Sequence, residues 1–258
     1  MAISLSSIIT GPSKDPLSIF LYGISGWGKT SWFDSCPNPI GIPTEDGAGV
    51  LSYSRFPVAT NYDDVIGAIK ELIEQDHDYK TVCIDTVDRL EPLIYKKVVD
   101  NYNENNRKQI KSHADIGHGQ GWSQGVELLH VILKGLEILR TKKQMMVVLL
   151  AQSLIKKIEL PDQEPYDKYD TALNDKMSLA YRSWAQIVMF GSYKIRLLES
   201  EKTKKIKAYG EGERVLYTEE RPHYWGKHRH GLPQEIIVPR TGQWESFKSY
   251  LNTNKTGE

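Results

Sequence analysis

Apolar residues along the chain follow two spacings that alternate. Short apolar runs of strand length occur at residues 17–22, 39–43, 81–84 and 145–151. Apolar residues at helical spacing mark residues 63–74, and further helices are expected at residues 29–35, 90–101 and 123–142. This order of strands and helices predicts an α/β fold, with a mostly parallel central sheet and helices on both faces.

Beyond residue 152 the pattern changes. Residues 153–173 are polar and contain Pro161 and Pro165, which predicts a long loop before a helix at residues 174–184. From residue 187 onward the sequence is strand-like and predicts antiparallel hairpins at the C-terminal edge of the sheet. Since no repeat or linker divides the chain, we expect a single domain over residues 1–258, with the hairpin region at about 187–240.

Composition narrows the class of protein only slightly. The chain has 258 residues and 40% hydrophobic residues, which is sufficient for a large core. Lys and Arg total 33 and Asp and Glu total 33, so any contact with nucleic acid would depend on local patches. Cys36 and Cys83 lie far apart in apolar surroundings, as buried thiols in a reducing compartment do. With no apolar run of membrane-spanning length and no basic leader, we expect a cytoplasmic protein without a membrane partner.

The segment GISGWGKT, residues 23–30, matches the phosphate-binding pattern GxxxxGK[ST] between a strand and a helix. The expected nucleotide-binding residues are Gly23, Ile24, Ser25, Gly26, Trp27, Gly28, Lys29, Thr30 and Ser31. Backbone N–H groups would bind phosphate, Lys29 would reach the β and γ oxygens of ATP in catalysis, and the Thr30 hydroxyl would bind Mg²⁺. The alternative is a glycine-rich turn before a helix.

Three polar residues follow other predicted strands. Asp85 ends TVCID and is expected to hold Mg²⁺ with Thr30; the alternative is a cap of the next helix, and Asp88 is its neighbouring competitor. Glu45 in PTEDGAG is a candidate general base for an attacking water, or else a loop carboxylate. Gln152 ends MMVVLLAQ and is expected to sense the γ-phosphate, or else to be a surface glutamine.

In this order and spacing, GISGWGKT, IPTEDGAG, TVCIDT, DIGHGQGW, LLAQS and RPHYWGKHRHGLP resemble the phage-encoded ATPases with a RecA-like core, and among them the Sak-type single-strand annealing proteins. The resemblance covers roughly residues 15–240. It implies that Glu45 is the catalytic glutamate and that Gln152 is a switch between the nucleotide and a DNA loop. Lys227 and Arg229 would be a finger pair inserted into the ATP site of the neighbouring subunit.

The same resemblance implies a RecA-like P-loop NTPase core that hydrolyses ATP with Mg²⁺. Such a protein would bind single-stranded DNA and promote annealing or homologous recombination as a head-to-tail ring or filament in the host cytoplasm. A single-strand-binding protein is a further implied partner. A ring helicase, a DNA-packaging motor and a non-catalytic module stabilised by ATP are the alternative functions on this core.

Direct signals for DNA binding come from three segments. Residues 194–207 contain six basic and two acidic residues, including Lys202, Lys204 and Lys205. Residues 105–122 and 155–170 interleave basic and aromatic residues, as non-specific single-strand binders do. The alternative for the first segment is a solvated edge strand that its lysines protect from aggregation.

Overall fold

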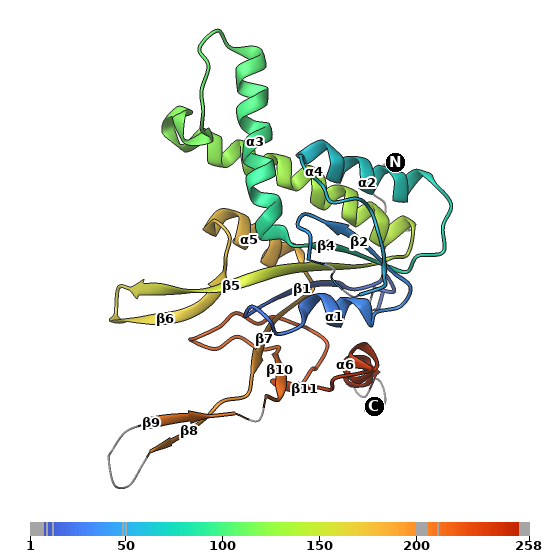
Figure 1. Cartoon of the computed structure of the whole chain (residues 1–258), viewed down its shortest axis with the longest axis vertical. Helices are drawn as coiled ribbons and strands as arrows, with labels where there is room; N and C mark the ends of the chain where they lie inside the picture. Colours follow the sequence, from blue (N-terminus) through green and yellow to red (C-terminus); the bar gives the residue numbers. More distant parts are fainter. Residues whose placement is uncertain are drawn as a thin grey trace.

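A mostly parallel sheet forms the centre of the computed structural model (Figure 1). The structure describes residues 8, 10–11, 13–47, 49, 51–199, 206–210 and 212–252. Within these residues nine strands form one sheet, whose main path runs β11-β10-β7-β1-β5-β4-β2-β3, with β6 paired to β5. The strands are β1 (Ser18–Gly23), β2 (Pro39–Pro43), β3 (Ser54–Arg55), β4 (Thr81–Asp85), β5 (Met146–Leu160), β6 (Gln163–Thr171), β7 (Ile187–Tyr193), β10 (Arg214–Tyr217) and β11 (Glu235–Val238).

The six strands from β7 to β3 in this path are parallel, and β10 and β11 add an antiparallel edge. Strand β5 lies between β1 and β4, in register such that Gln152 is opposite Gly23. Because β1 and the first six residues of β5 are buried on both faces, each is a nearly continuous apolar run, as central parallel strands are. The carboxyl ends of β1 and β4 therefore meet at one edge of the sheet, next to Gln152 of β5, and β5 continues beyond this edge.

Helices cover both faces of the sheet. The helices are α1 (Lys29–Asp34), α2 (Tyr62–Glu74), α3 (Val87–Asn105), α4 (Gln120–Lys142), α5 (Asp175–Trp184) and α6 (Gln243–Asn252), with short 3₁₀ turns η2 (His113–Asp115) and η3 (Gly117–Gly119) before α4. Apolar side chains of α2 to α5 pack on one face, and those of α1 and α6 pack on the other. Alternate residues of each central strand thus enter two separate cores.

Several elements begin where local sequence signals favour them. Asn61 and Asp64 form a reciprocal capping box at the start of α2, in which Asn61 Oδ1 accepts from Asp64 N at 2.9 Å and Asp64 Oδ2 accepts from Asn61 N at 3.2 Å. Asn174 caps α5 by accepting a hydrogen bond from the backbone N–H of Lys176. These caps fix the residues at which α2 and α5 begin.

The predicted α/β class and the mostly parallel sheet are confirmed. The loop predicted at residues 153–173 is wrong, because β5 continues to Leu160 and pairs with β6 in an antiparallel hairpin. Pro161 lies in the turn of this hairpin, and Pro165 lies on β6, next to the register shift at residues 158–160. Proline is compatible with a strand in such places, so its presence did not exclude one.

The hairpins predicted after residue 187 are partly confirmed. Strand β7 is not an edge hairpin strand but the parallel neighbour of β1. The antiparallel pairs among the described residues of this region are β7 with β10, β10 with β11, and the separate ribbon of β8 (Arg196–Glu199) with β9 (Ile206–Tyr209). This ribbon, the β5–β6 hairpin and the far end of α3 with η2 and η3 extend outward from the sheet (Figure 1).

Candidate nucleotide site

The nine residues Gly23–Ser31 form the turn from the carboxyl end of β1 into the first turn of α1. Gly28 caps α1 with φ at 99°, a conformation that a side chain would strain. At Gly23 an added Cβ would stand 2.4 Å from the carbonyl oxygen of Gly191, so only glycine permits this close approach of β1 to β7. Gly26 also has a positive φ, at 74°, so the local geometry explains all three glycines in the motif.

Trp27 anchors the loop to the adjacent strand. Its side chain is fully buried, and its Nε1 donates a 2.8 Å hydrogen bond to the carbonyl oxygen of Ser192 on β7. The ring also lies against Gly191, where an added Cβ would approach it to 2.9 Å. The Tyr193 hydroxyl donates to the carbonyl oxygen of Gly26 at 2.9 Å. Trp27, unusual at this motif position, thus has a packing role that holds the loop against β7.

Lys29 is buried beneath the loop. Its Nζ donates to the carbonyl oxygens of Gly23 at 3.0 Å and Ile24 at 3.2 Å, and to Gln152 Oε1 at 2.8 Å. Burial lowers the pKa of Lys29, and the nearby carboxylates of Asp88 and Asp85 oppose this shift. The ammonium group is therefore fixed between the carboxyl end of β1 and Gln152 of β5.

Thr30 and Asp85 lie together, as predicted. The Thr30 hydroxyl donates to Asp85 Oδ2 at 2.8 Å, and Asp85 is buried at the end of β4. Burial raises the pKa of Asp85, while the hydrogen bond from Thr30 lowers it. A hydroxyl and a carboxylate oxygen are ligands that Mg²⁺ prefers, so these two residues fit a magnesium ion held together with nucleotide phosphates. Such an ion would neutralise charge on the phosphate oxygens.

In the sequence Asp88 stood out only as a competitor of Asp85 for the metal-binding position. In the structure it has a different role. Its Oδ1 accepts a 2.8 Å hydrogen bond from the backbone N–H of Gln152. The start of α3 is thereby joined to the point where β5 leaves the sheet. Asp88 positions Gln152, and through it the hydrogen bond to Lys29.

Glu45 lies directly after β2, beside the end of β4. Thr44 fixes this placement, because its N–H donates to the Asp85 carbonyl at 2.9 Å. Its hydroxyl also donates to the carbonyl oxygen of Thr86 and accepts from the Thr86 N–H. The Glu45 carboxylate is 35% exposed and pairs with Arg89 Nε at 3.1 Å. Arg89 was not predicted, since nothing in the sequence marks a cation on the first turn of α3 as a partner of Glu45.

Lys227 and Arg229 lie near the amino ends of β1 and β7, whereas the phosphate loop follows the carboxyl end of β1. Lys227 pairs with Val188 near the amino end of β7, and its Nζ donates to the carbonyl oxygens of Arg182 at 2.7 Å and Ser183 at 3.2 Å. Arg229 lines a cavity together with Leu17 and Gln186, which precede β1 and β7. Burial and the neighbouring cations of Arg229 and Arg182 lower the pKa of Lys227. The pair is therefore placed away from the P-loop of its own chain.

The three segments predicted to bind DNA differ in surface charge. Arg107, Lys108 and Lys111 are exposed after α3, and none of these side chains forms an ion pair with another described residue. Trp122 in the same segment packs edge-on against His113, with ring centroids 4.2 Å apart. The ring of Trp122 therefore packs within the protein, against His113.

The β5–β6 hairpin is not basic, because residues 155–170 contain three lysines and five carboxylates. Lys156 pairs with Asp175 at 2.8 Å, and Lys168 is buried, with its Nζ 3.1 Å from the ring centroid of Trp225. In the β8–β9 ribbon, Lys202, Lys204 and Lys205 lie outside the described residues.

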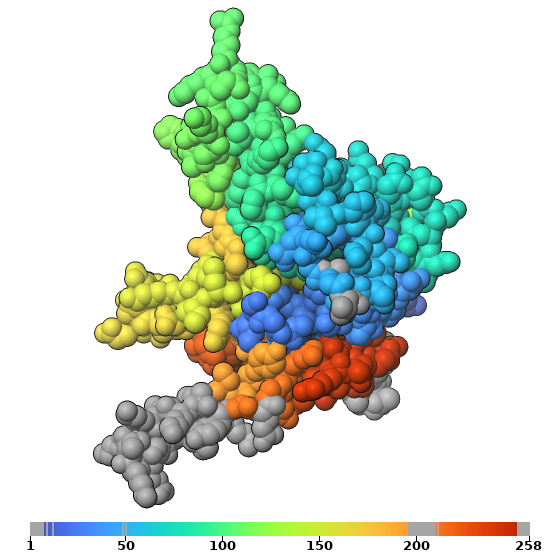
Figure 2. Space-filling model, in the orientation of Figure 1, coloured from blue at the N-terminus to red at the C-terminus, as the bar shows by residue number. Residues whose placement is uncertain are grey.

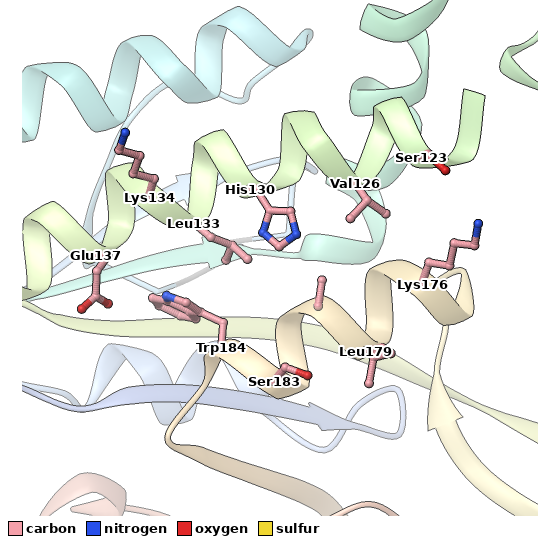
Figure 3. A pocket seen from close by; sticks show the side chains of 11 residues that line it. Ser123, Val126, His130, Leu133, Lys134, Glu137, Lys176, Leu179, Ser183 and Trp184 are labelled. Carbon is pink, nitrogen blue, oxygen red and sulfur yellow. The ribbon is translucent and has the colours of Figure 1, made fainter. Parts of the chain in front are cut away.

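A groove lies between α4 and α5 (Figure 3). This groove has a volume of about 800 Å³ and is lined by apolar residues that include Val126, Leu133, Leu179 and Trp184. None of the residues Gly23–Ser31 lines it. It is therefore separate from the nucleotide site.

The profile of a protein family described as an AAA domain matches residues 15–230. The chain belongs to this family. The match spans the phosphate loop, Asp85, Gln152 and the segment with Lys227 and Arg229, and it indicates an ATP-hydrolysing P-loop enzyme that binds nucleotide. No curated protein sequence matches the chain. In the described part of this AAA domain, no helix combines the length and the hydropathy that a membrane span needs.

Proposed function

We propose that this AAA domain is a Mg²⁺-dependent ATPase whose turnover is coupled to single-stranded DNA, and that it promotes annealing or homologous recombination. One observation carries the coupling: the 2.8 Å hydrogen bond from Lys29 Nζ to Gln152 Oε1. It joins the phosphate loop to the strand that leaves the sheet as the β5–β6 hairpin. Gln152 also donates to Asp88 at the start of α3, so a change in the contacts of Lys29 can be transmitted both to this hairpin and to the helix at whose far end the exposed basic residues lie.

The residues of the site have distinct roles in hydrolysis. Loop N–H groups and Lys29 bind phosphate oxygens and stabilise the charge that they carry in the transition state. Thr30 and Asp85 hold the cation. Glu45 accepts a proton from the attacking water, and its ion pair with Arg89 orients the carboxylate.

Single-stranded DNA binds through phosphate contacts at the end of α3. Arg107, Lys108 and Lys111 are exposed on an element that projects from the sheet (Figure 2). Without ion-pair partners among the described residues, their charges are free to bind a polyanion. The basic residues of the β8–β9 ribbon form a second contact in this proposal.

Subunits associate head to tail, and Lys227 and Arg229 act on the ATP of the next subunit. Lys227 forms an isolated β-bridge and Arg229 follows it in a bend, and both residues line the same cavity, so both cations can reach a single phosphate group. Their place near the amino end of β7 supports action in trans rather than on the P-loop of the same chain. A head-to-tail interface of this kind generates rings or filaments.

The deciding experiment measures ATP turnover with and without single-stranded DNA, with Lys29→Ala as the inactive control. We expect DNA to stimulate turnover, and complementary strands to anneal faster with the protein. Directional unwinding of a tailed duplex would instead identify a helicase or packaging motor. Negligible turnover with DNA present would identify a non-catalytic module.

A second measurement tests the DNA site. Replacing Arg107, Lys108 and Lys111 together with Gln should lower the slope of log K against log salt by about 2, since each contact to a single strand contributes about 0.7. The matched control replaces three exposed helical lysines, Lys70, Lys134 and Lys248, and should leave the slope unchanged. Equal slopes in both variants would show that these three residues do not contact DNA, and the β8–β9 ribbon would then be the proposed DNA site.

A further inference from the structure

A second cation stands beside the phosphate loop, on the side opposite Lys29. Arg214 begins β10, where it pairs with Tyr193 of β7. Its Nη1 is 2.7 Å from the position that a Cβ on Gly28 would occupy, and the same position is 3.9 Å from the Cβ of Ser31. The guanidinium group therefore lies against the last glycine of the loop and near the first turn of α1.

The Nη1 atom of Arg214 is buried and has no hydrogen-bond partner among the described residues. A buried guanidinium N–H without a partner lowers stability, because the desolvation of a charged donor is not compensated. Arginine at this place is thus not explained by the fold alone. A planar guanidinium is well suited to binding phosphate oxygens, with two N–H groups directed at one anion.

The order of the strands shows which part of a nucleotide Arg214 faces. Gln152 and Asp85 lie on β5 and β4, on one side of β1, and mark the γ-phosphate and metal end of the site. Arg214 lies on β10, beyond β7, on the other side of β1. A phosphate chain that runs through the loop from the γ end therefore has its α-phosphate on the side of Arg214.

We propose that Arg214 is a nucleotide-binding residue that contacts the α-phosphate and contributes equally to the binding of ADP and ATP. This inference rests on the proposed nucleotide site but assigns it a residue outside the loop motif. It also separates two functions of cations around the loop. Lys29 stabilises charge that develops in hydrolysis, whereas Arg214 retains the nucleotide before and after hydrolysis.

The test compares Arg214→Met and Arg214→Lys with the wild type by calorimetric titration of MgADP and of Mg²⁺ with a non-hydrolysable ATP analogue. For Arg214→Met we expect Kd to rise about tenfold for both ligands, which corresponds to about 1.4 kcal/mol. Arg214→Lys should recover part of the loss, because it keeps the charge. The KM for ATP should rise in the same proportion as Kd, since ground-state and transition-state binding are weakened alike. Arg55→Met removes an exposed arginine from β3 at the opposite edge of the sheet and is the matched control.

Thermal unfolding without nucleotide distinguishes binding from a structural role. Loss of an unpaired buried donor should leave the Tm of Arg214→Met equal to or above that of the wild type, and the increase of Tm by ADP should be smaller. A lower Tm without nucleotide would show that Arg214 supports the fold and would overturn the inference, as would an unchanged Kd. A higher Kd for the ATP analogue alone, with an unchanged Kd for MgADP, would place Arg214 at the γ-phosphate and refute the assignment. If the wild type bound neither ligand, the proposed function would fail together with this inference.

Discussion

Lys29 Nζ and Gln152 Oε1 are joined by a 2.8 Å hydrogen bond between the phosphate loop and the end of the buried part of β5. A second bond, from Gln152 N to Asp88 Oδ1, holds the same residue to α3. Gln152 is therefore fixed from two sides, at the point where β5 passes from the core into the projecting hairpin. It connects the expected γ-phosphate position with a surface element.

Replacing Gln152 with Ala should separate nucleotide binding from the response to DNA. The loop and Lys29 remain, so Kd for ATP should change less than threefold, while stimulation of turnover by single-stranded DNA should largely disappear. Steady-state kinetics with and without DNA measure both effects. Gln163→Ala, at the exposed far end of the hairpin, is the control and should retain stimulation. Full stimulation in Gln152→Ala would show that the coupling takes another route.

Replacing Glu45 with Gln should lower kcat and leave ATP affinity nearly intact, because a base is lost while the binding groups remain. General-base catalysis contributes about 10² to 10⁴ in rate, which sets the expected range. Asp46→Asn, in the same loop, is the control and should be nearly fully active. If ATP binding fell in parallel with kcat, Glu45 would instead have a structural role.

Replacing Asp85 with Asn should abolish Mg²⁺-dependent turnover and, at neutral pH, raise the Tm of the protein without nucleotide. Burial raises the pKa of Asp85 above the usual 3.8, so the ionised carboxylate lowers the free energy of unfolding at any pH above the folded-state pKa. This destabilisation is relieved as the pH falls through that pKa. Thermal unfolding measured from neutral pH down to pH 4 should therefore show the difference in Tm between the two proteins becoming smaller as the pH falls. A lower Tm for Asp85→Asn at neutral pH would contradict this interpretation.

Mixing two inactive variants tests whether Lys227 and Arg229 act across a subunit interface. The double variant Lys227→Ala/Arg229→Ala keeps an intact phosphate loop, and Lys29→Ala keeps intact fingers. Each alone should lose turnover, because fingers supplied in trans contribute about 10³ to 10⁵ in rate. Mixed assemblies should regain part of the ATPase activity. No recovery in mixtures shown to co-assemble would exclude the trans role.

The phosphate loop, Asp85 and Gln152 could be predicted because each follows a strand that is itself evident from its apolar run. Their close approach then follows from the parallel order of β1, β4 and β5. Arg89 and Arg214 could not be predicted, since their roles depend on tertiary neighbours, Glu45 and Gly28, that no local spacing connects to them. The β5–β6 hairpin was missed because its polar residues do not alternate strictly with apolar ones, and pairing between its two strands stabilises it instead.

The indole of Trp27, hydrogen-bonded to Ser192 and packed on Gly191, has a consequence for how quickly nucleotide is captured. A free glycine-rich loop would lose conformational entropy when it closed around phosphate, and that loss would weaken binding. Here the loop is ordered when the chain folds, so the entropy is lost during folding rather than at each binding event. Capture of nucleotide then requires no prior rearrangement of the loop, and its rate is set by diffusion and by the orientation of the two molecules as they meet.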